Sequence, residues 1–146
     1  MSLPTEQLAA ASTPPLYQSP SQRCILYQGD GYVLSVLTGR VMHEEYKVYF
    51  ENMLQIMLET GNKAIMHNIL DLERSDSISR AWLVTSFAPR MARLIGTDLR
   101  LAVVNSRNSV QKAASGFLLK VGQQLGFSQV QFFDSVSEAE GWLLRP

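Results

Sequence analysis

Three serines lie close together just before an apolar stretch, and a hydroxyl is the group that a protein kinase modifies. Ser75, Ser77 and Ser79 stand where a predicted strand gives way to a predicted helix. A phosphate there would lie beside the exposed N–H groups and the positive end of the helix dipole, and it would add about −1.5 to −2 charges. The alternative, which is the ordinary one, is that one serine caps the helix and the others are solvated. The sequence thus gives a candidate regulatory phosphosite.

Arginines follow the acidic first half of the chain. Arg80, Arg90 and Arg93 come after a region dominated by Glu and Asp. If these arginines lie on one face, that face is suited to an acidic protein, a phosphate or a lipid headgroup. The alternative is an ordinary pair of solvated helix faces, since a charge run usually has no further role. We treat the three arginines as a candidate partner or anion surface.

Four aromatic residues form a candidate apolar pocket. Tyr46 and Phe50 lie on one predicted helix, and Trp82 and Phe87 lie on the next. Core packing is the alternative, because a helical period already explains their spacing.

The chain carries no evident catalytic or metal-binding set. His67 and Asp71 are four residues apart on a predicted strand, which separates them by about 13 Å and leaves no nucleophile between them. His43 has no second His or Cys nearby, and Cys24 is the single cysteine. We therefore predict a non-enzymatic protein without a metal or cofactor, in which His67 is a hydrogen-bonded structural residue and His43 is exposed to solvent.

Composition narrows the class of protein further. The chain has 146 residues, 46% of them hydrophobic, and a formal net charge of zero. This is enough for one core, but it gives no basic field that would attract nucleic acid. The lone cysteine suits a reducing compartment, and no segment has the apolar length of a transmembrane helix or the pattern of a signal peptide. The sequence predicts a cytoplasmic protein.

A change in composition near residue 22 marks the domain boundary. Residues 1–22 carry four prolines among Ser, Thr, Gln and Ala, a composition that cannot bury enough surface to offset its ordering entropy. We predict a flexible N-terminal arm over 1–22 and a single domain over 23–146.

Strands alternate with helices along this domain. The predicted elements are a hairpin of residues 24–27 and 32–37, a helix over 42–59 ended by Gly61, a strand over 64–70, a helix up to Ile95 with a kink or break at Pro89, a strand over 99–104, a helix over 110–125, a strand over 129–133 and a closing helix after Ser135. Ser135 and Glu138 have the spacing of a capping box. The fold class is a mixed five-stranded α/β sheet with about four helices.

This order of elements carries a resemblance. The following motifs match in order and spacing: Ile69-Leu70-Asp71-Leu72 ending the third strand, Trp82 with Phe87-Ala88-Pro89, Leu101-Ala102-Val103-Val104, and Phe133-Asp134 followed by Trp142-Leu143. On these motifs, which span about residues 23 to 144, the chain is similar to the SpoIIAA-like (STAS/SEC14-type) family of small bacterial proteins, and its fold resembles that of anti-sigma-factor antagonists.

The resemblance implies a regulatory role but not a phosphorylation switch. In antagonists that are phosphorylated, an Asp-Ser-Ser-Gly-type motif begins the helix after the third strand, and a partner kinase modifies its serine. Residues 73–79 here read Glu-Arg-Ser-Asp-Ser-Ile-Ser, which lacks Ser-Ser-Gly.

Two functional hypotheses follow, with an enzyme as a third. The first is a protein-interaction module that contacts an unidentified protein partner through residues 73–79 and the helix start there. The second is a carrier or sensor of an apolar or amphipathic small molecule, bound near the four aromatic residues. A homo-oligomer is compatible with either hypothesis, because an edge strand or apolar helix face needs covering.

Overall fold

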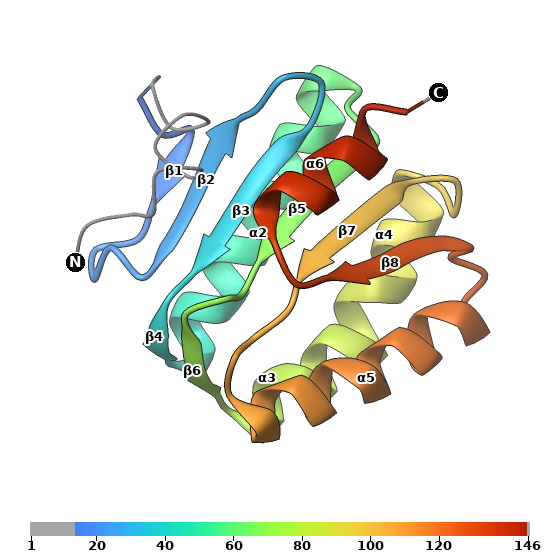
Figure 1. Cartoon of the computed structure of the whole chain (residues 1–146). Helices are drawn as coiled ribbons and strands as arrows, with labels where there is room; N and C mark the ends of the chain where they lie inside the picture. Colours follow the sequence, from blue (N-terminus) through green and yellow to red (C-terminus); the bar gives the residue numbers. More distant parts are fainter. Residues whose placement is uncertain (1–13, 146) are drawn as a thin grey trace.

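The computed structural model describes residues 14–145, except for the side chains at positions 109–111, 115 and 117. Its main sheet has six strands in the order β1-β2-β3-β5-β7-β8. Their bounds are β1 Tyr17–Gln18, β2 Cys24–Gln28, β3 Val33–Leu37, β5 Ala64–Asn68, β7 Arg100–Val104 and β8 Gln129–Phe133. The first three strands pair antiparallel and the last four pair parallel. The mixed α/β sheet that the sequence predicted is confirmed (Figure 1).

The predicted strand count of five is corrected to six. The additional strand, β1, pairs Tyr17 with Leu26 and Gln18 with Ile25. It falls within residues 1–22, which composition indicated as an arm, and it is short enough to lack any periodic signal of its own. Residues 1–13 lie outside the described part of the chain, so for them the arm remains a prediction.

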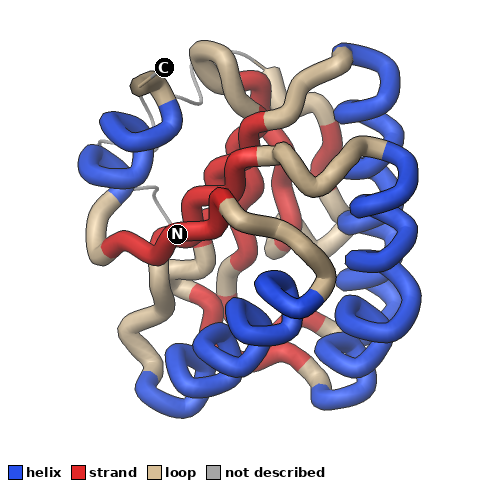
Figure 2. Tube along the Cα trace, turned by 90° about the vertical axis from the view of Figure 1, so that its right-hand side faces the viewer, coloured by secondary structure: helices blue, strands red, loops and turns tan. Residues whose placement is uncertain are grey.

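Helices cover the two faces of the sheet unequally. The bounds are α2 His43–Thr60, α3 Ser77–Trp82, η1 Leu83–Phe87, α4 Ala88–Leu94, α5 Ser109–Gln124 and α6 Val136–Leu143. Figure 2 shows the short helix near the C-terminus on one side of the strands and the other helices on the opposite side. Strand residues alternate in direction, so two separate apolar clusters form, one on each face.

The segment α3, η1 and α4 is continuous across Pro89, where the sequence predicted a kink or two short helices. η1 is a π-helical turn, in which the Ala88 N–H donates to the Leu83 carbonyl five residues earlier. Pro89 lies in the first turn of α4, where a missing N–H costs little. The wider turn therefore lets one helical segment run from Ser77 to Leu94.

A second, two-stranded parallel sheet lies at the end of the main sheet where β3 and β5 finish. It pairs β4 (Gly39–Val41) with β6 (Leu72–Ser75). The sequence predicted a loop and helix start over residues 73–79, so β6 corrects that interpretation at residues 73–75. Pairing to β4 fixes the start of α3 relative to the start of α2, which follows β4 directly.

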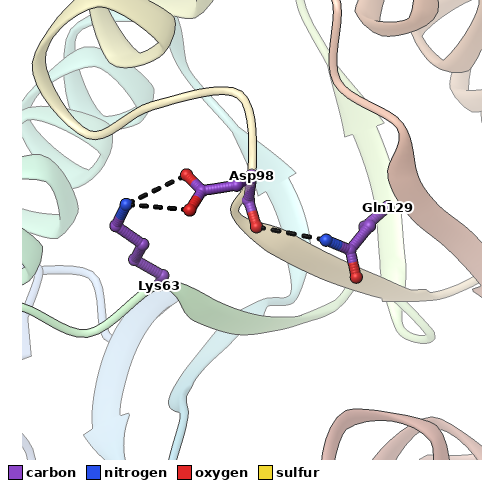
Figure 3. A network of polar contacts seen from close by, with 3 residues as sticks. All are labelled: Lys63, Asp98 and Gln129. Atoms are coloured by element: carbon purple, nitrogen blue, oxygen red, sulfur yellow. Dashed lines mark hydrogen bonds and ion pairs between the residues drawn. The ribbon is translucent and has the colours of Figure 1, made fainter. Parts of the chain in front are cut away.

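The opposite end of the sheet is closed by polar contacts. Lys63 Nζ donates to both carboxylate oxygens of Asp98, at 2.9 and 3.0 Å, and Gln129 donates to the Asp98 carbonyl at 3.4 Å (Figure 3). These residues precede or begin β5, β7 and β8, so the contacts join the amino ends of three adjacent strands. Since the residues are exposed, the pair contributes little to stability.

The described part of the chain contains no helix with the length and apolar character needed to cross a membrane.

Candidate functional site

The three predicted serines lie at one end of the fold but in different environments. Ser75 ends β6 and is buried, and its hydroxyl accepts from Arg80 at 3.3 Å. Ser79 is fully buried, and its hydroxyl lies 2.9 Å from Nδ1 of His43. Ser77, the first residue of α3, is exposed. Of the three hydroxyls, that of Ser77 is thus the one accessible to a modifying enzyme, and its phosphorylation stays a prediction.

The contact between His43 and Ser79 joins the starts of two helices. Met42 holds the N-cap position of α2 and Asp76 that of α3, and neither side chain makes a capping hydrogen bond. The prediction that a serine caps α3 is therefore wrong. The prediction that His43 is solvent-exposed is also corrected, because its ring is half-buried against α3.

Two large apolar side chains project from this junction. Met42 is 61% exposed and Ile78 is 60% exposed. Each immediately precedes one member of the His43–Ser79 pair, so the same hydrogen bond positions both. Together with the exposed Ser77, they form what we call the docking surface: Met42, Ser77 and Ile78. Apolar side chains held in the open in this way are typical of contact sites.

The three predicted arginines have different surroundings. Arg80 is half-buried and donates through one guanidinium nitrogen to the Ser75 carbonyl at 2.8 Å. Arg90 pairs with Glu51 of α2 and lies over the Phe87 ring at 5.6 Å. Arg93 is exposed on α4. Arg80 and Arg90 thus have protein partners of their own, and a shared anion surface of the three side chains stays a prediction.

The predicted aromatic residues gather between α2 and the α3–η1 segment. Tyr46 and Phe50 have ring centroids 4.6 Å apart, and Phe50 lies 5.2 Å from Phe87. Trp82 contacts two members of this group: its ring centroid lies 6.3 Å from that of Phe50 and 5.3 Å from that of Phe87.

A cavity of about 160 Å³ lies beside these rings, between the sheet and the covering helices. Tyr46, Phe50 and Phe87 line it, whereas Trp82 does not. The floor is formed by β5, β7 and β8 and the far wall by α5. The lining is mostly apolar, so the cavity suits an apolar or amphipathic occupant, which remains a prediction.

His67 is the polar residue on the cavity floor. Its Nδ1 lies 2.7 Å from the Ser35 hydroxyl on the adjacent strand β3. Burial lowers the pKa of His67 to about 4 because the charged imidazolium is poorly solvated there. The ring is therefore neutral at neutral pH, in a hydrogen-bonded position of the kind that the sequence analysis favoured.

The pair of His67 and Asp71 that the sequence analysis considered does not form. The Asp71 carboxylate lies 3.7 Å from the Arg107 guanidinium, with which it forms an ion pair. Among the described residues, no group of three or more His, Cys, Asp or Glu side chains is arranged to hold a metal ion.

Sequence reasoning missed Ser35, Met42 and Ile78. The serine lies alone in an apolar strand, and its role depends on the register with β5. The two apolar residues fit the helical patterns in their regions, and their exposure arises from the packing of two helix starts. Sequence alone gives no signal for the pairing of Ser35 with His67 or for the exposure of Met42 and Ile78.

The sequence matches no known protein-family model and no curated protein sequence. Two solved structures share its fold. A candidate anti-sigma factor antagonist of Thermotoga maritima superposes with a TM-score of 0.58 at 19% identity, over 82% of this chain and 93% of that one. An uncharacterised DUF3478-family protein from Shewanella loihica PV-4 gives 0.56 at 16% identity, over 82% and 91%. At these identities the likeness concerns the fold.

Proposed function

We infer that this chain, which has a SpoIIAA-like fold, is a non-enzymatic regulatory module that binds a protein partner through its docking surface. The observation that carries the proposal is the pair of exposed apolar side chains, Met42 and Ile78, positioned by the buried His43–Ser79 contact. Because this contact holds the backbone at both helix starts, binding would order little further backbone there, which favours recognition.

The surroundings support a contact with a protein. The exposed residues Glu73 and Arg74 of β6 and Arg40 of β4 lie on strands that lead to this surface. An apolar centre with a charged rim is the usual composition of a transient protein interface. One of the two similar structures is described as a candidate anti-sigma factor antagonist, which is a regulatory role.

Ser77 gives the proposed surface a means of control. Its hydroxyl is exposed and adjacent in sequence to Ile78. A phosphate there would place about −1.5 to −2 charges beside an apolar contact, which would weaken an apolar interface and strengthen one with basic residues.

The proposal is tested by quantitative affinity capture from the source organism, followed by crosslinking. We expect Ile78→Asp and Met42→Asp to lose the crosslinked partner by roughly tenfold or more, because each places a charge in the apolar contact. Leu58→Asp is the matched control, since Leu58 is an exposed apolar residue near the far end of α2. Equal capture by Ile78→Asp and the wild type would contradict the proposal.

The cavity favours a second candidate function, the binding of a small amphipathic molecule. This function needs no partner protein.

A further inference from the structure

The cavity has a size that small organic molecules fill. A cavity of about 150 Å³ in an apolar core binds benzene, and the volume here is about 160 Å³. Phe50 and Phe87 line one side, Met91 and Leu101 line others, and these side chains offer dispersion contacts to an apolar body. A ring or a short aliphatic chain is thus of the right size.

One end of the cavity carries a charge without a counter-ion. Arg80 lines the cavity, is half-buried, and takes part in none of the ion pairs among the described residues. Its two hydrogen bonds go to the carbonyl and the hydroxyl of Ser75, which also lines the cavity. A partly desolvated guanidinium is stabilised by an anion, and a planar carboxylate fits its donors best.

A second donor belongs to the same wall. Tyr46 lines the cavity and is 4% exposed, and its hydroxyl makes none of the hydrogen bonds found among the residues that the structure describes. Burial raises the pKa of Tyr46, and the positive charge of Arg80 acts against that rise, so the two groups are close enough to interact. A hydroxyl on the cavity wall that makes no bond to the protein can donate to a ligand oxygen.

We propose that this cavity binds a small amphipathic monocarboxylate, with its carboxylate held by Arg80 and Tyr46 and its apolar body packed against Phe50 and the neighbouring apolar lining. The inference goes beyond the proposed protein docking and does not depend on it. Arg80 is one turn beyond Ser77 on α3, so the ligand site adjoins the docking surface.

His67 restricts the ligand to a single charge. The His67 ring lies on the cavity floor in β5, whereas Arg80 belongs to α3. The Phe50 ring lies between His67 and Tyr46, 5.8 Å from the His67 ring and 4.6 Å from the Tyr46 ring. A neutral imidazole offers no charge to a second anionic or cationic group. Dicarboxylates and amino acids are therefore disfavoured, whereas a neutral polar substituent near His67 is accepted.

The test uses the purified full chain and two monocarboxylate probes, phenylacetate and octanoate. Comparing them shows whether the cavity prefers a ligand with an aromatic or an aliphatic body. Binding is followed by isothermal titration calorimetry and by NMR shifts of Met methyl groups, because Met53 and Met91 line the cavity. The matching neutral amides, phenylacetamide and octanamide, are titrated beside them. We expect at least one carboxylate to bind roughly tenfold or more tightly than its amide.

Three variants locate the carboxylate. Arg80→Met keeps the length of the side chain and removes its charge, and should weaken binding roughly tenfold or more. Arg93→Met is the matched control, since Arg93 is exposed on α4, and should bind as the wild type does. Tyr46→Phe should weaken binding by a few fold while leaving the melting temperature of the free protein equal or higher, because the lost hydroxyl has no protein partner.

Any one of three results would overturn the proposal. The proposal is overturned if neither carboxylate shifts the Met signals at millimolar concentration, if the amides bind as tightly, or if folded Arg80→Met keeps full affinity. Arg80→Lys guards against misfolding of the Met variant, because it retains charge and should retain most of the affinity. None of these measurements involves a partner protein, so their failure leaves the docking proposal standing, and the reverse also holds.

Discussion

The two faces of the sheet treat their polar side chains in opposite ways. On the face covered by α6, Arg100 donates to the carbonyls of Trp142, Leu143 and Arg145 at the end of that helix, at 2.6 to 3.1 Å. On the other face, Tyr46, His67 and Arg80 line a cavity, and of these His67 also contacts the Ser35 hydroxyl at 2.7 Å. The difference indicates that the α6 face serves stability, whereas the face under α2 to α5 leaves room for another molecule.

The α6 face also contains buried polar atoms without a hydrogen-bond partner, so the two faces do not differ in that respect. The Asn68 side-chain nitrogen and the Arg100 Nε are both buried without a hydrogen-bond partner. Both residues nevertheless make other hydrogen bonds, since the Asn68 oxygen accepts from the Leu70 N–H at 3.0 Å. The contrast therefore lies in the cavity and its donors.

The strongest way to break the α6 face is to remove Arg100. Arg100→Met should lower the free energy of unfolding by about 3 kcal/mol, because three charge-assisted hydrogen bonds at a helix C-terminus and the stacking on Trp142 are lost together. Urea denaturation monitored by circular dichroism measures it. Arg93→Met is the control for loss of an exposed charge, and a change below about 1 kcal/mol in the Arg100 variant would remove the basis for calling α6 a stabilising element.

A pair of enlarged alanines compares the packing of the two faces directly. Ala139 belongs to α6 and is fully buried in the apolar cluster between that helix and the sheet, so Ala139→Leu should cost about 2 kcal/mol by overpacking. Ala88 lines the cavity, so Ala88→Leu should be neutral or add about 0.5–1 kcal/mol. Thermal unfolding of both variants gives the answer. Equal destabilisation would show that the cavity has no spare room, and the comparison would then fail.

The smallest expected effect is a pH dependence from the cavity face. His67 has a pKa of about 4 in the folded chain against an ordinary value of 6.5, so between these values the unfolded chain binds a proton that the folded chain does not. The free energy of unfolding should therefore fall as pH is lowered, by about 1.5 kcal/mol between pH 6.5 and about pH 5.

The variant His67→Gln removes this titration, and a pH series of denaturant midpoints should be flatter for it than for the wild type. An unchanged slope in His67→Gln would mean that the imidazole is as well solvated as in the unfolded chain.

Elements with a clear period were predictable from the sequence. The predicted hairpin became β2 and β3, and Gly61 ends α2 at φ 71° with its N–H bonded to the Met57 carbonyl, as the left-handed preference of glycine indicates. Ser135 accepts from the Glu138 N–H at 3.2 Å, as a capping serine does. These signals are local, and a sequence carries local signals directly.

Features that depend on distant residues were not predictable. Strand β6 has two adjacent charged residues, Glu73 and Arg74, and so lacks the alternation typical of a strand; it exists because β4, more than thirty positions earlier, pairs with it. Ser79 resembles its neighbours Ser75 and Ser77 in sequence, yet His43 and the packing of α2 bury it. The cavity likewise arises from the distance between helices and sheet, which no single stretch of sequence encodes.

The π-helical turn at η1 changes the phase of the helix that contains it. An α-helix advances by about 100° per residue, and a turn that closes five residues back holds one residue more than usual. The face that α3 presents through Arg80 is therefore offset by one position from the face that α4 presents through Met91, although both residues line the same cavity. An alignment that applies one uninterrupted period to Ser77–Leu94 will misassign one half of it, so relatives of this chain are best aligned on each side of the turn separately.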